Sequence, residues 1–221
     1  MKIHILGLSG SPVKGGNNDI YLKKALKAAE DTGSEVTTDF FSIAGKKIKG
    51  CIHCNYCVNK QTKERPCSIK DDMDELYPKL TEADGFIFCT PTYIGRLSGQ
   101  MACLFDRFRP LIHGPLFHGA LRNKPAGSLT VIWVRHCGAE IALLTLQMAA
   151  LTLDMLPVGL GIEGGQLGGT GVTSFGGTGE FDPDDKHLIL KDDYGLDLAN
   201  AMGRRVVEVA KLIKAGKEIV D

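Results

Sequence analysis

The sequence lacks an excess of charge of either sign. Its 221 residues contain 26 Lys and Arg against 26 Asp and Glu, which leaves a formal net charge of zero at pH 7. Proteins that bind nucleic acid or anionic membrane surfaces generally carry a basic excess, because phosphate groups attract it. We therefore expect neither nucleic acid nor a membrane among the partners of this chain.

Long hydrophobic runs and internal repeats are also missing. The longest N-terminal apolar stretch, residues 3–8 with His4 inside it, is too short for a signal-peptide core or a membrane span. We expect a cytoplasmic protein, in a compartment where disulfides are rare. The length suits a single domain over residues 1–221, which is large enough to bury a core without disulfides or metal ions to stabilise it.

Seven cysteines are unexpected in such a chain. An odd number argues against a disulfide framework and for metal ligands, reactive thiols or core packing. Four of them, Cys51, Cys54, Cys57 and Cys67, fall within seventeen residues, whereas Cys89, Cys103 and Cys137 are scattered. We expect Cys89 and Cys103 to pack in the core, since free cysteine behaves there as a small hydrophobe.

Strand and helix signals alternate along the chain. Hydrophobic patterning predicts strands over 2–8, 36–41, 85–89, 126–134 and 157–162, and helices over 20–29, 71–80, 98–108, 139–151 and 196–215. This alternation is typical of an α/β fold with a five-stranded parallel sheet and helices on both faces. In such sheets, ligands bind beyond the carboxyl ends of the strands.

Two segments interrupt the alternation. The cysteine segment, residues 45–68, has no periodicity and contains the four clustered cysteines. The glycine segment, residues 161–179, has nine glycines among nineteen residues. We expect it to be a loop with a function, either over a cofactor or at a subunit interface, because structureless loops of this length are uncommon.

The first loop, residues 9–18, lies between the first predicted strand and helix. A helix N-terminus offers unpaired N–H groups to a phosphate, and Ser9, Ser11, Asn17 and Asn18 would add donors. The loop is neither a Walker A motif nor G-x-G-x-x-G. A terminal monophosphate bound without metal, as in flavin mononucleotide (FMN), suits it best. A polar turn with an Asn cap is the alternative.

Three loops together resemble the NADPH-dependent FMN reductase family, which has the flavodoxin-like fold. They are the first loop, with Ser9-Gly10-Ser11-Pro12 and Gly15-Gly16-Asn17; the second loop, residues 90–98, with Asp106-Arg107 closing the next helix; and the third loop, residues 135–140. The resemblance implies a flavodoxin-like three-layer sandwich with the cysteine segment inserted.

The same resemblance implies FMN as cofactor and a set of residues that hold it. These are Ser9, Ser11, Pro12, Lys14, Asn17, Asn18, Pro91, Thr92, Tyr93, Ile94, Gly95, Arg135, His136 and Gly138. Tyr93 as an ordinary packed tyrosine, and Arg135 with His136 as a solvated pair, are open alternatives. Cys137, in the third loop, is a further candidate to approach the flavin.

The cysteine motif Cys51-x2-Cys54-x2-Cys57-x9-Cys67 indicates a metal centre. Two-residue gaps in tandem are the habit of bacterial ferredoxins, whereas structural zinc usually takes two separated knuckles. We predict a [4Fe–4S] cluster, with zinc and a three-iron cluster as alternatives. His53, inside the motif, is a possible substitute for one thiolate.

This motif in an FMN-reductase-like chain resembles the iron–sulfur flavoproteins of anaerobic archaea and bacteria. The resemblance implies that the four clustered cysteines bind a [4Fe–4S] cluster, that the flavin accepts its electrons, and that the protein forms homodimers or homotetramers. Their last gap is typically shorter than this one, so Cys67 departs from the pattern.

Pairing the two cofactors predicts an FMN-dependent electron-transfer oxidoreductase that links a one-electron donor such as ferredoxin to a small two-electron acceptor. No catalytic acid or base is required, and none is assigned. Three alternatives are a NAD(P)H-dependent flavin, quinone or nitro-compound reductase with a structural or zinc-bound cysteine loop, a redox or oxygen sensor, and a purely structural zinc module.

Overall fold

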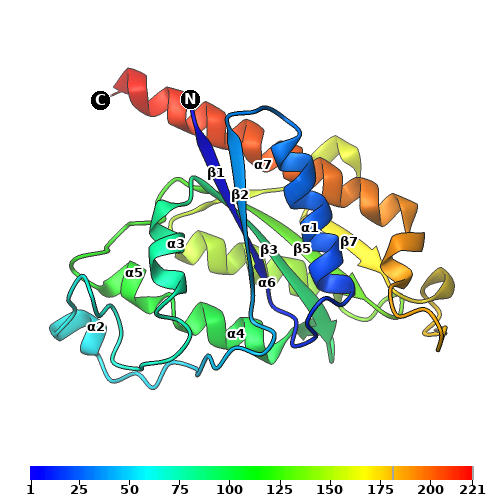
Figure 1. The fold of residues 1–221 in the computed structure, drawn as a ribbon, viewed down its shortest axis with the longest axis horizontal. Coiled ribbons are helices and arrows are strands. Elements are labelled where there is room, and N and C mark those ends of the chain that lie inside the picture. Colours follow the sequence, from blue (N-terminus) through cyan, green and yellow to red (C-terminus); the bar gives the residue numbers. More distant parts are fainter. Residues whose placement is uncertain (181, 221) are drawn as a thin grey trace.

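The computed structural model describes residues 1–180 and 182–220 and is built around a parallel sheet. The strands lie in the order β2 (Val36–Ser42), β1 (Ile3–Ser9), β3 (Gly85–Tyr93), β5 (Pro125–Ile132) and β6 (Leu156–Val158). Figure 1 shows β1 and β3 at the centre of this sheet. The predicted α/β fold with a parallel sheet is confirmed.

Two further strands make the sheet seven-stranded rather than five-stranded in the described residues. β4 (Arg96–Leu97) folds back antiparallel on β3, and β7 (Gly169–Val172) runs parallel beside β5. The strand expected over 157–162 corresponds to the shorter β6, which pairs only with the beginning of β5. The C-terminal half of β5 pairs with β7 instead.

The expectation that residues 161–179 are loop throughout is wrong at β7. A Cβ atom on Gly169 would lie 2.8 Å from Leu129 Cδ2, and one on Gly171 would lie 2.4 Å from Ile189 Cδ1. The glycines at these two positions allow the strand to lie close to its neighbours. The segment also contains the short 3₁₀ helices η1 (Gly161–Glu163) and η2 (Phe175–Gly177).

Helices cover both faces of the sheet. One face carries α1 (Asn17–Glu30) and α7 (Asp193–Val220), preceded by η3 (Leu188–Lys191); the other carries α3 (Leu76–Glu82), α4 (Gly99–Asp106), α5 (Arg109–His113) and α6 (Ala139–Thr152). Figure 1 shows α1 and α7 packed together. In the described ranges, no helix is long and apolar enough to cross a membrane.

The helix expected over 71–80 begins later, at Leu76. The carboxylates of Asp71 and Asp72, expected to open it, instead accept hydrogen bonds from the backbone N–H groups of Lys49 and Lys47. The helix expected over 98–108 is α4, which ends two residues early at Asp106, and the separate helix α5 follows it from Arg109. α2 (Tyr56–Asn59) is a short helix within the cysteine segment.

β3 continues to Tyr93, four residues beyond its predicted end. β1 ends opposite Cys89, so from Thr90 onward β3 pairs with β5 but no longer with β1. A proline is tolerated at such a position, because the strand is at a local edge. The extension carries Thr92 and Tyr93 past the rim of the sheet.

Candidate functional site

The first loop ends at an uncapped helix N-terminus. α1 begins at Asn17, and its N-cap residue, Gly16, has no side chain to bind the first N–H groups. These N–H groups have no partner within the helix, and they carry the positive end of the helix dipole. The site at the carboxyl edge of β1 is therefore suited to an anion.

A buried network holds the first loop in shape. The Asp19 carboxylate, 2% exposed, accepts hydrogen bonds from Ser9 Oγ at 2.5 Å and from the Gly15 N–H at 2.8 Å. Asn18 Nδ2 donates to Ser9 Oγ at 2.9 Å and to the Cys89 carbonyl at 3.2 Å. The side chains of Ser9 and Asn18 thus bind within the protein, beneath the loop.

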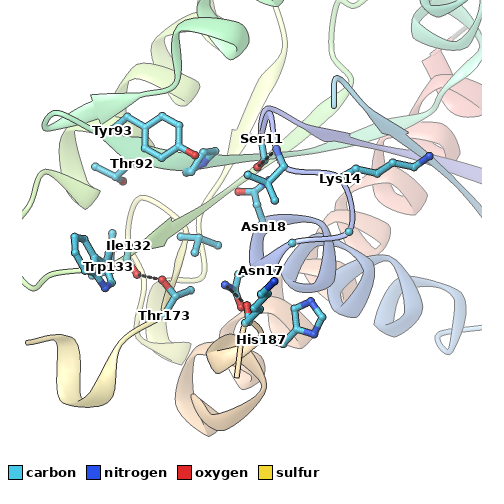
Figure 2. A pocket seen from close by; sticks show the side chains of 16 residues that line it. Ser11, Lys14, Asn17, Asn18, Thr92, Tyr93, Ile132, Trp133, Thr173 and His187 are labelled. Atoms are coloured by element: carbon cyan, nitrogen blue, oxygen red, sulfur yellow. Dashed lines mark hydrogen bonds between the residues drawn. The ribbon is translucent and has the colours of Figure 1, made fainter. Parts of the chain in front are cut away.

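Asn17 joins the first loop to a distant part of the chain. Its Nδ2 donates to the Lys186 carbonyl at 3.0 Å, and its Oδ1 accepts from the Ile189 N–H at 3.1 Å. This tether brings Lys186 and His187 to the rim of a pocket, where Figure 2 shows His187 beside Asn17. No sequence pattern signals either residue, because they lie in an irregular segment far along the chain.

The pocket has a volume of about 300 Å³ and lies at the carboxyl edge of the sheet. Its lining consists of Ser11, Val13, Lys14, Gly15, Gly16, Asn17, Asn18, Pro91, Thr92, Tyr93, Val131, Ile132, Trp133, Thr173, Lys186 and His187. Figure 2 shows Tyr93 and Trp133 across the pocket from Lys14 and Asn18. One end is therefore polar and the other aromatic.

Trp133 is the single tryptophan of the chain and is half exposed at the aromatic end. It directly follows β5, and Thr173 Oγ1 donates to the neighbouring Ile132 carbonyl at 3.0 Å. Its place at the end of a parallel strand was the signal for a site residue. Trp133 was not named as a site residue, because the strand was expected to run over 126–134 and so to include it.

The second loop contains the end of β3, a tight turn at Ile94 and Gly95, and β4. Ile94 and Gly95 both have positive φ, 48° and 74°, as a two-residue hairpin requires. The Ile94 side chain is 98% exposed, and a β-branched residue in this region is strained. Neither residue lines the pocket.

Hydrogen bonds join the second loop to the first. Ser98 caps α4 by accepting from the Met101 N–H at 3.0 Å, and its hydroxyl donates to the Gly10 carbonyl at 2.6 Å. The Thr90 hydroxyl in turn accepts from the Ser98 N–H at 3.1 Å. The loops that line the pocket are thus one connected unit.

The third loop packs against the second rather than lining the pocket. A Cβ atom on Gly138 would lie 2.4 Å from the Gly95 carbonyl oxygen. The Arg135 N–H donates to the Gly177 carbonyl at 2.8 Å, and His136 is exposed with a φ of 56°. Of the predicted cofactor residues, Ser9, Pro12, Ile94, Gly95, Arg135, His136 and Gly138 lie outside the lining.

The four clustered cysteines border one small cavity of about 20 Å³. Cys51 and Cys54 are exposed, Cys67 is half-buried and Cys57 is 7% exposed. No three metal-ligating side chains converge on one point within residues 1–180 and 182–220. All four cysteines therefore border one cavity, but in the described residues their side chains do not converge on a single metal position.

Hydrogen-bond donors surround the sulfur atoms. The His53 N–H donates to Cys51 Sγ at 3.4 Å, and Cys54 Sγ shares a hydrogen bond with Ser68 Oγ at 3.0 Å. The Ser68 contact, followed by a backbone bond, lowers the pKa of the Cys54 thiol. Burial raises the pKa of Cys57. Donors of this kind stabilise thiolate ligands.

The other three cysteines lie apart from this cavity. Cys89 is fully buried and donates to Asn18 Oδ1 at 3.2 Å, and burial raises the pKa of its thiol. Cys103, in α4, is half-buried rather than fully packed. Cys137 is half-buried in the third loop and does not line the pocket. The described cysteines are all free thiols.

Residues 3–162 match the family model of the NADPH-dependent FMN reductases. An iron–sulfur flavoprotein of Methanocaldococcus jannaschii is 39% identical over 95% of this chain and 98% of its own length. A NAD(P)H dehydrogenase (quinone) of a Chelativorans species is 33% identical over 62% of this chain and 68% of its own.

Among solved structures, RosB with bound 8-demethyl-8-formylriboflavin-5′-phosphate superposes with a TM-score of 0.73. The match covers 96% of this chain and 81% of RosB at 16% sequence identity. A likeness at this identity is evidence for the fold. It shows the flavodoxin-like arrangement that the three loops predict.

Proposed function

The chain belongs to the iron–sulfur flavoproteins of the NADPH-dependent FMN reductase family, and from that premise we propose that it is an electron-transfer oxidoreductase with two cofactors. It is an FMN-dependent oxidoreductase by family. The proposal adds a [4Fe–4S] cluster at the cysteine cavity, ferredoxin as the electron donor and a small molecule as the acceptor. The observation that carries it is the meeting of all four clustered cysteines at one cavity.

The groups at both ends of the pocket support its assignment to FMN. A phosphate suits the uncapped N-terminus of α1, where Lys14 and the Ser11 hydroxyl also line the pocket. An isoalloxazine ring needs apolar cover and polar groups at its edge, and Tyr93, Trp133 and Thr92 lie at the other end. Lys186 adds positive charge at the rim.

The cysteine cavity fits a cluster in its chemistry. Four thiols from one compact segment border it, and backbone and side-chain donors reach Cys51, Cys54 and Cys57. The cavity is smaller than a cubane cluster, so assembly requires the exposed Cys51 and Cys54 side chains to turn inward and the segment to widen. Free thiols of this kind persist in a reducing cytoplasm.

When bound, FMN exchanges one or two electrons together with protons, whereas a [4Fe–4S] cluster exchanges one electron at a time. Two equivalents of a one-electron donor are oxidised for each acceptor molecule that takes up two electrons and two protons. One helix connects the two sites: α4 follows its cap, Ser98, at the end of the second loop, and it ends beside Arg107 at the cysteine cavity.

The proposal includes a homodimer or homotetramer. An apolar stripe on α6 supports it: Ile141, Leu144, Met148 and Leu151 are each at least 44% exposed at helical spacing. Contiguous apolar surface of this kind marks protein interfaces.

A direct NAD(P)H-dependent quinone reductase is the second candidate, favoured by the similarity to the Chelativorans protein of that name. In that case reduced nicotinamide is the donor, and the cysteine cavity has a structural role or holds zinc.

Protein purified without oxygen tests both candidates. We expect bound FMN, about four iron and four sulfide ions per chain, and a visible absorption shoulder beyond the flavin bands. Reduction of the flavin is then followed after mixing with reduced ferredoxin or with NADPH. Fast reduction by ferredoxin and slow reduction by NADPH support the electron carrier. A zinc-loaded, iron-free protein that NADPH reduces rapidly contradicts it and supports the reductase.

A further inference from the structure

Arg107 joins the two ends of the segment that contains the four clustered cysteines. Its side chain is 1% exposed, and its Nη1 donates to the Lys49 carbonyl at 2.9 Å and to Asp71 Oδ2 at 2.6 Å. Its Nη2 donates to Asp71 Oδ1 at 3.1 Å and to the Ile69 carbonyl at 3.3 Å. One guanidinium therefore binds the backbone on both sides of the four-cysteine motif.

Asp71 completes the closure. Besides pairing with Arg107, its carboxylate accepts from the Lys49 N–H at 3.0 Å and from the Met73 N–H at 3.2 Å. The residues two before Cys51 and four after Cys67 are thus held by one buried ion pair, whose side chains are 1% and 3% exposed. A paired charge fixed in this way resists loosening, because separation would leave a charge buried without a partner.

Arg107 also borders the cysteine cavity and keeps one donor without a partner. Its Nε is buried, and no acceptor for it occurs in the described parts of the chain. Buried donors normally find partners. The Nε–H of Arg107 is therefore an exception among the buried side-chain donors of the described residues.

Arg109 acts on the interior of the motif. Its Nη2 donates to Asn55 Oδ1 at 2.8 Å, and its Nη1 donates to Cys57 Sγ at 3.7 Å. Asn55 has a φ of 57° in the turn between Cys54 and Cys57. No carboxylate is ion-paired with Arg109 within residues 1–180 and 182–220, although exposed Asp106 also borders the cavity.

We propose that the two arginines have separate roles toward the metal centre: Arg107 holds the two ends of the cysteine segment together, and Arg109 raises the reduction potential of the centre. The proposal rests on the cluster proposed above. The potential of an iron–sulfur cluster depends on nearby charge and on hydrogen bonds to its sulfur atoms. Arg109 supplies both, whereas the charge of Arg107 is balanced by Asp71.

This assignment separates Arg107 from the flavin. Asp106-Arg107 resembles the end of a flavin-binding stretch in the sequence, but the eight-residue helix α4 separates Arg107 from the cap at Ser98. A helix of that length spans about 12 Å. Arg107 therefore lies with the cysteines and is absent from the lining of the flavin pocket.

Limited proteolysis of the iron-free, FMN-loaded chain tests the positioning role of Arg107 without any cluster. Lys60 and Lys63 are exposed trypsin sites within the cysteine segment. We expect Arg107→Met and Asp71→Asn to be cleaved there at least tenfold faster than the wild type. Arg107→Lys keeps the charge but not the paired geometry, so its cleavage rate should fall between those of the wild type and Arg107→Met. Unchanged FMN affinity reports intact folding.

Equal cleavage rates in variants and wild type, with FMN still bound, would overturn the positioning role. An intermediate rate for Arg107→Lys is the result that distinguishes positioning by the fork geometry from bulk packing. A rate for Arg107→Lys equal to that of Arg107→Met would contradict a contribution from the charge.

A redox titration followed by electron paramagnetic resonance tests Arg109. We expect Arg109→Gln to disfavour reduction at least tenfold, a fall of 59 mV for one electron, and Arg109→Lys to recover part of it. Arg122→Gln, which removes an exposed arginine paired with Asp154, is the control and should leave the potential unchanged.

An unchanged potential in Arg109→Gln that still holds a full cluster overturns the role of Arg109 alone. Wild-type protein with no iron overturns the proposed function and, with it, the role of Arg109. The proteolysis of the iron-free chain then still decides the role of Arg107. The two failures are therefore distinguishable.

Discussion

The Asn17 side-chain amide donates a hydrogen bond to the Lys186 carbonyl oxygen at 3.0 Å, across 169 residues of sequence. The amide oxygen accepts a second bond from the Ile189 N–H. The first residue of α1 therefore fixes the segment that leads into α7, and this segment becomes one wall of the pocket proposed for FMN (Figure 2).

Asn17→Ala is expected to weaken FMN binding roughly tenfold. Each lost hydrogen bond is worth about 1 kcal/mol, and about 1.4 kcal/mol corresponds to a factor of ten in affinity. The loss acts by loosening the wall that holds Lys186 and His187. Titration of flavin fluorescence measures the dissociation constant, with Asn200→Ala, outside the pocket, as control. Equal affinities for both variants would show that the tether does not shape the pocket.

Gly138→Ala should destabilise the protein and weaken flavin binding, because the new methyl group would meet the Gly95 backbone. Gly119→Ala is a matched control: its φ of 70° is also positive, but a Cβ there has nothing within 4 Å. We expect about 1 kcal/mol for the control, from backbone strain alone, and at least about 2 kcal/mol more for Gly138→Ala. Denaturant unfolding measures both. Similar losses of stability in the two variants would show that the third loop does not pack closely against the second.

Cys51→Ala and Cys67→Ala should each remove most of the iron while the flavin stays bound. The reason is that all four clustered cysteines border the cavity, whereas the pocket proposed for FMN is a different one. Cys103→Ala, which changes a half-buried cysteine outside the cavity lining, is the control and should keep its iron. Iron content and visible absorption are measured on protein purified without oxygen. Loss of flavin with the iron retained would contradict the division of sites.

The free energy of unfolding should rise with pH between about 8 and 10.5 through Lys124. Burial lowers the pKa of this lysine from 10.5 to about 8. Between these values the unfolded chain binds more protons than the folded chain, so rising pH favours the folded state; below about pH 8 the folded protein must keep the buried charge.

Lys124→Met should lack this rise, although it also loses the hydrogen bond to the Thr81 carbonyl. Denaturant unfolding at several pH values gives the slope for each protein. Burial raises the pKa of Tyr21, Tyr77 and Cys89, which opposes the trend at the alkaline end, but both proteins share that effect. Identical slopes would rule out the buried lysine as their source.

Hydrophobic patterns in the sequence predicted those strands and helices whose formation depends on residues close together in the chain. The apolar run before Ser9 and the spacing from Ile20 to Ala29 predicted β1 and most of α1 correctly. Periodicity has no access to close approach between distant segments. It therefore placed Gly169–Val172 in a loop, although the missing side chains are what allow that strand to pack.

The candidate site divides in the same way. Pro91, Thr92 and Tyr93 were identified by their place after a predicted strand, and the structure puts them on the pocket wall. Trp133 and His187 also line the pocket, one from the end of a strand predicted too long and the other from a segment without regular structure. The end of its strand could have signalled Trp133, whereas no pattern marks His187, so only the folded chain reveals His187.

The sequence by itself determined the chemistry available to this protein: an α/β sheet, a loop suited in composition to an anion and four thiols in a compact segment. Residue types and short spacings encode these features, because the interactions that form them are local. The tertiary structure decided which groups surround that chemistry. Arg107 and Arg109 reach the cysteines, and Asn17 reaches Lys186, only because packing of the helices on the sheet brings distant segments into contact.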